Sequence, residues 1–303
     1  MTTLASKRAA LAAQLAALDA EEAKAAEAME RARPRPTIDE GEASDIATVL
    51  LDRRERGLRI VQLDALPSSL RSIEDVYAVH AAMCSISSTL GDHIGFKVGA
   101  AGAAAMKSMG LVEPFRAPLF ATSIVKSASG DRDTCYPPSS ILACEAEVAF
   151  VLGRDLPARP GSGGGGGAGH LPYCETDVWD AVSHVCPAIE VCGSRYGGAA
   201  AAGANPLHKI ADGGLNVACV LGAAVDKNTP GLSVAYFKTL AVEMSGSGGG
   251  TATGTGANVL GSPLSSLAWL ANSLATSAPD VRACHCNHTH DSGTMYYTMY
   301  GSM

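Results

Sequence analysis

Three glutamates stand in apolar stretches of the sequence where carboxylates are uncommon. Glu145 and Glu147 belong to the run 143–152, and on a strand they would share one face about 6.6 Å apart at Cα, with the apolar side chains on the other face. Glu190 lies inside a second apolar run, 185–193. Since Asp and Glu are rarely buried unless they are paired or bind a metal, these acids predict an all-oxygen site for Mg²⁺ or Mn²⁺. The alternative for the first pair is a half-exposed strand with two solvated acids.

Lys97 is the candidate catalytic residue. In the run 93–99, Phe96 and Val98 would point into a core, whereas Lys97 shares its face with Gly95 and Gly99. Missing side chains beside a lysine leave room for a ligand, so this pattern predicts that Lys97 lines a small-molecule site.

Another group of metal-binding residue types lies near the end of the sequence. The segment 283–290 reads Ala-Cys-His-Cys-Asn-His-Thr-His. Structural zinc sites space pairs of ligands by two to four residues with a longer loop between the pairs, and this segment does not. We therefore interpret it as part of an atypical tail. The chain has 9 cysteines, an odd number that indicates reduced thiols in a cytosol-like compartment.

The elements that would position these residues form a β-rich core with flanking helices. Short β-type runs separated by Gly, Pro and Asp are expected at 93–99, 119–126, 141–152, 187–193, 215–222 and 237–244. Helices are expected at 3–32, at 43–56, from the capping signal of Ser72 and Glu74 onward, at about 175–184, and at 263–274 with Ser262 as N-cap. Two glycine-rich stretches, 161–169 and 246–256, interrupt the pattern, and the first is expected to be a surface loop.

Composition sets the class of protein. A chain of 303 residues with 47% hydrophobic and 17% charged residues can build a packed core, which excludes wholesale disorder. The net charge of −7 provides no basic field for phosphates, so we expect no nucleic-acid partner. No apolar run is long enough to span a membrane, and we expect a soluble, cytoplasmic protein. Mitochondrial import stays an alternative, because the first 18 residues include Lys7 and Arg8 and no acid.

These motifs, taken in order, resemble the 2-keto-4-pentenoate hydratase family of the fumarylacetoacetate hydrolase superfamily. The match extends over about 43–275 and rests on GFKVG at 95–99, EP at 113–114, PLF at 118–120, EAEVAF at 145–150, PAIEVCGSR at 187–195, AD at 211–212, GANVLGSPL at 256–264 and AWLAN at 268–272. The resemblance implies an α+β fold with a rolled mixed β-sheet core and a small 2-oxo acid substrate. It further implies that Glu145, Glu147 and Glu190 hold a divalent cation, Mg²⁺ or Mn²⁺, and that Lys97 is the active-site lysine.

The resemblance also implies a reaction and an organisation. We expect a hydro-lyase that adds water to a 2-hydroxydienoate such as 2-oxopent-4-enoate, working as a homo-oligomer. A 2-oxo acid decarboxylase, a C–C hydrolase of the same superfamily and a catalytically inactive remnant are the alternatives. The chain would divide into an Ala-rich helical extension at 1–36, a helical part at 43–92, the catalytic core at 93–275 and a tail at 276–303.

The sequence departs from the family in three places. Phe115 follows Pro114 where some hydratases have an aspartate that is a proposed acid/base. The segment 213–216 reads Gly-Gly-Leu-Asn where the family usually has Asn-Ala and small hydroxyl residues. After the helix at 263–274 the family continues with closing strands, whereas 276–303 shows no alternating apolar run. We therefore expect the closing strands to be missing and the tail to be poorly ordered.

Overall fold

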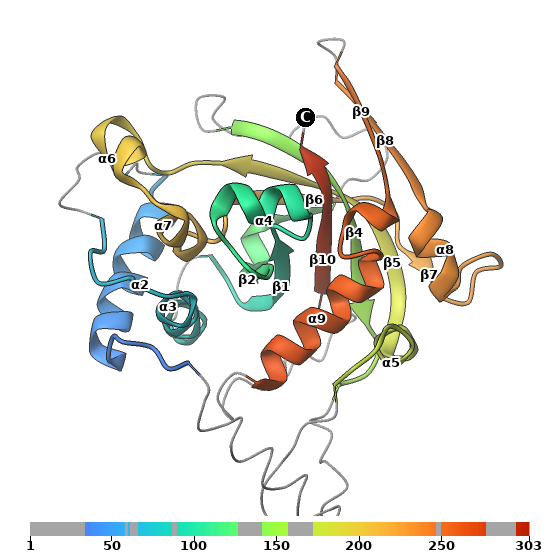
Figure 1. Cartoon of the computed structure of the whole chain (residues 1–303), viewed down its shortest axis with the longest axis horizontal. Coiled ribbons are helices and arrows are strands. Elements are labelled where there is room, and N and C mark those ends of the chain that lie inside the picture. The colour runs from blue at the N-terminus through green and yellow to red at the C-terminus, as the bar shows by residue number, and fades with distance from the viewer. Residues whose placement is uncertain are drawn as a thin grey trace, which may run out of the picture.

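The protein forms one curved mixed sheet with helices packed around it (Figure 1). The computed structural model describes residues 34–57, 60, 66–86, 90–126, 141–156, 172–246, 250–276 and 295–302. Among these residues the strands of the large sheet follow the order β2-β1-β10-β4-β5-β6-β3, and β7 pairs with β5. Their bounds are β1 His93–Gly99, β2 Phe115–Phe120, β3 Ile124–Lys126, β4 Ile141–Leu152, β5 Val182–Gly193, β6 Asn216–Leu221, β7 Val225–Asp226 and β10 Met295–Ser302.

A separate two-stranded hairpin extends beyond the large sheet (Figure 1). It consists of β8 Ala241–Ser245 and β9 Thr251–Thr255, whose side chains alternate between exposed and half-buried. The threonines at 251, 253 and 255 favour an extended backbone, and beyond the paired residues the Gly246 amide donates to the Gly250 carbonyl at 2.9 Å.

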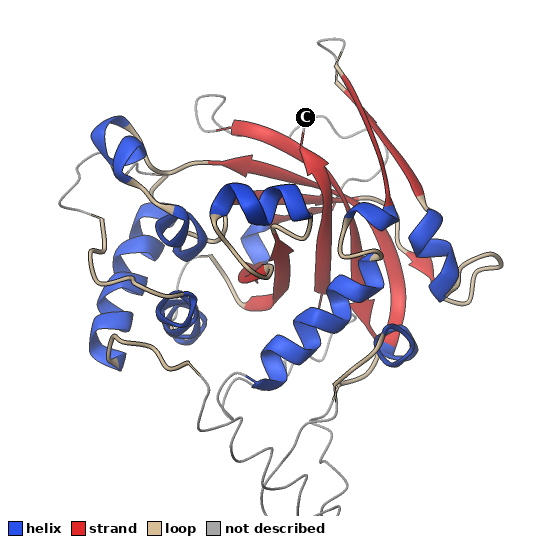
Figure 2. Ribbon diagram, in the orientation of Figure 1, coloured by secondary structure: helices blue, strands red, loops and turns tan. Residues whose placement is uncertain are grey.

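The helices gather at two places around the strands (Figure 2). Helices α2 Glu40–Glu55, α3 Ile73–Ser85, α6 Gly198–Gly203 and α7 Pro206–Ala211 lie at one end of the sheet in this view. Helices α4 Ala103–Met109, α5 Glu175–Ala181, α8 Val234–Thr239 and α9 Pro263–Thr276 complete the set. Short 3₁₀ turns at Ala121–Ser123 and Gly256–Asn258 connect further elements.

Capping side chains mark where helices α2 and α3 begin. The Asp39 side chain accepts a hydrogen bond from the Glu42 amide at the start of α2. Helix α3 begins with a capping box in which Ser72 accepts from the Asp75 amide and the Asp75 carboxylate accepts from the Ser72 amide. The predicted cap at Ser72 is confirmed, although the reciprocal acid is Asp75 rather than Glu74, because Asp75 occupies the third helical position.

The two faces of the large sheet have different partners. On β4, Val148 and Phe150 point to the outer face, where they pack in a cluster with Leu264, Leu267 and other apolar residues of α9. Ala149 points to the inner face and packs with residues of β5, β6 and β2. The predicted alternation of 143–152 is therefore confirmed, and Glu145 and Glu147 fall on the inner face with Ala149.

Several predicted elements differ from those observed. The helix expected at 175–184 ends at Ala181, because β5 begins at Val182 and its first residues pair with β4 and β7. The run 119–126 is broken by a 3₁₀ turn into parts of β2 and β3. The run 237–244 is divided between α8, which ends at Thr239, and β8. In each case the observed end of the helix or strand depends on whether those residues pair with a neighbouring strand.

The end of the chain also differs from the expected disordered tail, because residues 295–302 form β10. This strand pairs in parallel with β1 and antiparallel with β4, so it lies inside the sheet. Its sequence, Met-Tyr-Tyr-Thr-Met-Tyr-Gly-Ser, is rich in residues that favour strands even though polar and apolar types do not alternate. Residues 277–294 lie outside the described part, and the absence of the family's other closing strands stays a prediction.

Other predictions concern residues that the structure does not describe. These are the leading helix at 3–32, the glycine-rich segment 161–169 and the Cys/His segment 283–290. The division into four segments likewise stays a prediction. The mixed α/β architecture is observed, and no described helix is long and apolar enough to cross a membrane.

Candidate metal-binding site

The curvature of the sheet brings Lys97 on β1 to Glu190 on β5. In the strand order these two strands are separated by β10 and β4. Nevertheless, Lys97 Nζ donates to both carboxylate oxygens of Glu190, at 2.5 and 2.6 Å. Both side chains are fully buried, with 0% of their surface exposed. The sheet is therefore rolled, with Lys97 and Glu190 meeting across its inner face.

The carboxylates come from two adjacent antiparallel strands. Glu145 on β4 lies directly opposite Glu190 on β5, and Glu147 lies opposite Ala188. Opposite residues of an antiparallel pair share a face, so the register places all three carboxylates on the inner face. Glu145 is 7% exposed and Glu147 is 4% exposed. The four residues predicted from the sequence, Lys97 and the three glutamates, therefore gather in one buried region.

The electrostatics of this region are unfavourable without a further positive charge. Burial raises the pKa of Glu147 well above its ordinary value, and the neighbouring charge of Glu190 raises it further. Burial also raises the pKa of Glu190, although the Lys97 ammonium opposes that shift. For Lys97, burial is the largest single effect and would lower the pKa, but the negative charges of Glu190 and of the neighbouring acidic groups together outweigh it and the pKa rises. Lys97 therefore stays protonated.

Glu147 has the least satisfied carboxylate of the three. Neither of its oxygens has a hydrogen-bond partner among the residues that the structure describes. A buried acceptor without a partner costs about 1–3 kcal/mol, and more when it is charged. Such a group must take up a proton or lie against a cation.

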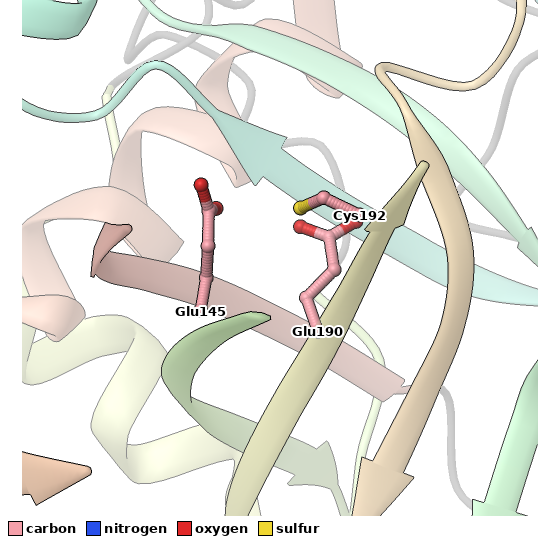
Figure 3. A group of neighbouring side chains, drawn as sticks. All are labelled: Glu145, Glu190 and Cys192. Carbon is pink, nitrogen blue, oxygen red and sulfur yellow. The ribbon is translucent and has the colours of Figure 1, made fainter. Parts of the chain in front are cut away.

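Cys192 is a member of the group that sequence reasoning did not select. The nearest ligand atoms of Glu145, Glu190 and Cys192 lie within 4.8 Å of one another, and all three residues are buried. Figure 3 shows Glu190 and Cys192 on one strand, with Glu145 beside them. The signal in the sequence was the spacing of two residues between Glu190 and Cys192, which places both on the same face of a strand.

The loop before β6 fixes Glu190 and Lys97 in place. Asn216 Nδ2 donates to Glu190 Oε1 at 2.7 Å, and the Gly214 carbonyl accepts from Lys97 Nζ at 3.1 Å. Gly213, Gly214 and Leu215 all have positive φ, of 79°, 62° and 66°. Three successive residues in this region turn the chain sharply, and the first two glycines allow it at low cost.

An ion pair anchors the same loop from outside. Arg195 Nε donates to both carboxylate oxygens of the buried Asp212, each at 2.7 Å. The Arg195 guanidinium also donates to the carbonyls of Asp212 and Asn216, and Arg54 of α2 donates to the same two carbonyls. Charge-assisted hydrogen bonds from one guanidinium to a carboxylate and two carbonyls give geometric precision as well as energy. Arg195 and Arg54 are therefore positioning residues for the loop that holds Glu190.

Phe115 fills the space that the sequence assigned to a ligand. A Cβ added to Gly99 would lie 2.1 Å from the Phe115 ring, and one added to Gly214 would lie 2.4 Å from it. The ring centroid is 6.0 Å from Lys97 Nζ. The expectation that Gly99 leaves room for a ligand beside Lys97 is therefore wrong, because an aromatic side chain occupies that room.

The residues present fit a divalent cation. When ionised, the three glutamates carry three negative charges against the single positive charge of Lys97, which leaves a deficit of two in a buried region. Carboxylate oxygens are the ligands that Mg²⁺ and Mn²⁺ prefer. The assignment of Glu145, Glu147 and Glu190 as ligands and of Lys97 as catalytic residue stays a prediction, which the charge deficit and the orphaned Glu147 support.

Comparisons with known proteins find relatives that are similar to this chain in sequence and in fold. No family model matches the chain. A 2-keto-4-pentenoate hydratase of Paraburkholderia xenovorans strain LB400 is 29% identical over 216 residues, covering 70% of this chain and 71% of the relative. The TodF product hydratase of Pseudomonas putida strain F1 is 26% identical over 246 residues, covering 80% of this chain and 82% of the relative.

A solved structure shares the fold. It is 4-oxalocrotonate decarboxylase from Pseudomonas putida G7, complexed with magnesium and adipate, with a TM-score of 0.63 and 22% sequence identity. The match covers 89% of this chain and 91% of that chain. The two chains therefore share their overall fold. The sequence is similar to those of 2-keto-4-pentenoate hydratases, and the resemblance to them that was inferred from the motifs is confirmed.

Proposed function

We propose that this protein is a lyase that depends on a divalent cation and adds water to a small 2-hydroxydienoic acid, the enol form of a 2-oxo acid. The observation that carries the proposal is the buried group of three glutamates with only one lysine to balance them. Acids of this kind are rare in an apolar interior unless a cation is bound. The hydratases to which the sequence is similar supply the reaction type.

The proposed chemistry is electrophilic. A divalent cation held by Glu145, Glu147 and Glu190 would supply positive charge to the substrate's carboxylate and 2-oxygen, where negative charge develops during tautomerisation and water addition. Lys97 carries a second positive charge in the same region, because its Nζ stays protonated beside Glu190. Its proton can be donated to, and recovered from, an oxygen of the substrate.

The surrounding residues keep these groups in position. Asn216 and the Gly214 carbonyl hold Glu190 and Lys97 at fixed distances, so little reorganisation accompanies the reaction. Phe115 covers one side of Lys97, and its ring is 3% exposed. Removing water from this side strengthens each charge interaction within the site.

The test is a spectrophotometric assay of the purified full-length protein. The absorbance of a 2-hydroxydienoate should fall upon addition of Mg²⁺ or Mn²⁺ and should not fall in excess EDTA. Glu145→Gln should abolish the cation-dependent reaction. Glu243→Gln, in the exposed hairpin, is the matched control and should retain wild-type turnover.

Product analysis separates the candidate reactions. A hydrated 2-oxo acid as product supports the hydro-lyase. Release of CO₂ would assign a decarboxylase, and cleavage to two carbon fragments would assign a C–C hydrolase, so either result would refute the proposed reaction while retaining the cation. Absence of turnover over a panel of 2-oxo acids, with Mg²⁺ bound, would identify an inactive relative.

A further inference from the structure

We propose that Cys192 gives the cation site a sulfur ligand, so that the site binds thiophilic divalent cations such as Co²⁺, Zn²⁺ and Cd²⁺ through a thiolate and two carboxylates. The inference rests on the cation site of the proposed function and extends it to the choice of metal. Mg²⁺ and Mn²⁺ would bind to the carboxylates and leave the thiol protonated.

The backbone register places the sulfur where a ligand is needed. Cys192 and Glu190 are two residues apart on β5, so both side chains point to the inner face. Glu145 lies directly across from Glu190 on β4. This arrangement gives three donors on two strands that are rigidly hydrogen-bonded to each other, which is a better support than a loop.

The distances are compatible with one shared ion. A tetrahedral ion with ligand bonds of about 2.1 to 2.3 Å holds neighbouring ligand atoms about 3.5 Å apart. The nearest donor atoms of Glu145, Glu190 and Cys192 already lie within 4.8 Å of one another. Glu190 is held in place by Lys97 and Asn216, so small rotations of the Glu145 and Cys192 side chains would close the remaining gap of roughly 1 Å.

A second, independent observation points to a ligand at the same place. Glu147 is 4% exposed and follows Glu145 on the same face of β4, yet neither of its oxygens has a hydrogen-bond partner in the described part of the chain. Its carboxylate is therefore a fourth potential ligand, with no hydrogen-bond partner among the described residues. Two or three carboxylates with one thiolate form a mixed site that suits cations of intermediate softness.

Binding of a thiophilic cation to Cys192 releases the proton of the thiol. A bond forms between the cation and Cys192 Sγ, the S–H bond is lost, and its proton passes to the buffer. No oxidant or reductant takes part. Because sulfur binds soft cations better than hard ones, loss of the thiol should weaken Cd²⁺ and Co²⁺ binding and leave Mg²⁺ binding largely unchanged.

The test uses metal-free full-length protein in which Cys284 and Cys286 are both replaced by serine, since these thiols could bind the same cations. Titration with Co²⁺ should produce a near-ultraviolet band from charge transfer between sulfur and cobalt, saturating at one ion per chain. Cys192→Val should remove the band and lower the Cd²⁺ affinity by about tenfold or more, measured by calorimetry. The Mg²⁺ affinity should change by less than about threefold, because Mg²⁺ prefers oxygen ligands.

Two further variants keep the result interpretable. Cys186→Ser alters another buried cysteine on the same face of β5, about 20 Å away along the strand, and should retain the band. Cys192→Ser serves where the valine variant does not fold, and it should also lose the band.

Each outcome supports or refutes Cys192 as a ligand of the cation. A band that persists in Cys192→Val and Cys192→Ser, or is absent from the parent protein, refutes the sulfur ligand. If Mg²⁺ still binds in that case and Glu145→Gln abolishes its binding, the proposed function stands without Cys192. If no divalent cation binds at all, both proposals fail.

Discussion

Replacement of Lys97 by methionine should destabilise the metal-free protein strongly, and added Mg²⁺ should restore part of the loss. Methionine has a similar length but no charge. Glu190 would lose the donor at 2.5 and 2.6 Å from its oxygens and would keep the Asn216 amide, 2.7 Å from its Oε1. Breaking a fully buried ion pair by removing one partner costs about 3–5 kcal/mol.

The loss should depend on pH in a defined direction. In the variant the ammonium no longer opposes the effect of burial, so the pKa of Glu190 rises further above its ordinary 4.5. A carboxylate whose folded-state pKa is raised binds more protons in the folded state than in the unfolded state, so stability falls as pH rises above about 4.5. The difference between Lys97→Met and the wild type should therefore be small below about pH 4.5 and largest at neutral pH and above.

Urea unfolding in EDTA, followed by the fluorescence of Trp179 and Trp269, measures the effect, because both indoles pack against the outer core. Lys107→Met, at an exposed lysine of α4, is the control and should change stability by less than about 0.5 kcal/mol. Mg²⁺ at a hundred times its dissociation constant should return about 2.7 kcal/mol. If Lys97→Met is as stable as the wild type at neutral pH in EDTA, the buried ion pair does not stabilise the metal-free protein.

Three further changes test the site and its support. Glu147→Gln should weaken Mg²⁺ binding by about tenfold or more, and an unchanged calorimetric titration would contradict the role of Glu147 as a ligand. The same change should raise the thermal stability of the metal-free protein above pH 4.5, because it removes a buried carboxylate whose oxygens have no hydrogen-bond partner among the described residues. Gly214→Ala should destabilise by about 1–3 kcal/mol in chemical unfolding, because its φ is +62° and the new Cβ would lie 2.4 Å from the Phe115 ring; wild-type stability would show that the loop relaxes freely. Asp212→Asn should lower turnover by about tenfold with Mg²⁺ affinity retained, because the Arg195 anchor of the loop is weakened, and equal turnover would show that the anchor is dispensable.

Local sequence pattern was sufficient for β4, the strand that carries Glu145 and Glu147. The β4 bounds match the predicted 141–152, since this is a continuous, mainly apolar run whose two acids, Glu145 and Glu147, are two positions apart. The cap at Ser72 was equally local. By contrast, β10 depends on open pairing sites on β1 and β4, which lie far away in the chain and leave no mark on the strand's own sequence.

In the candidate site, too, some residues could be predicted from local sequence and others could not. Glu145, Glu147 and Glu190 could be selected because each is an acid in an apolar run, which is visible within ten residues of sequence. Cys192 could not, because a cysteine in an apolar strand is ordinary core material until the register with Glu145 is known. Phe115 was out of reach for a similar reason: only the rolled sheet brings its ring against Gly99 and Gly214.

The position of β10 has a consequence for how the chain folds. The strands on either side of it, β1 and β4, precede it by about 200 and 150 residues and do not pair with each other. Among the described residues, the backbone hydrogen bonds that link β1 to β4 run through β10 and have very long sequence separation, which slows folding. During synthesis, both halves must wait with open hydrogen-bonding edges until residues 295–302 have emerged, and this interval is when we expect a chaperone to be needed most.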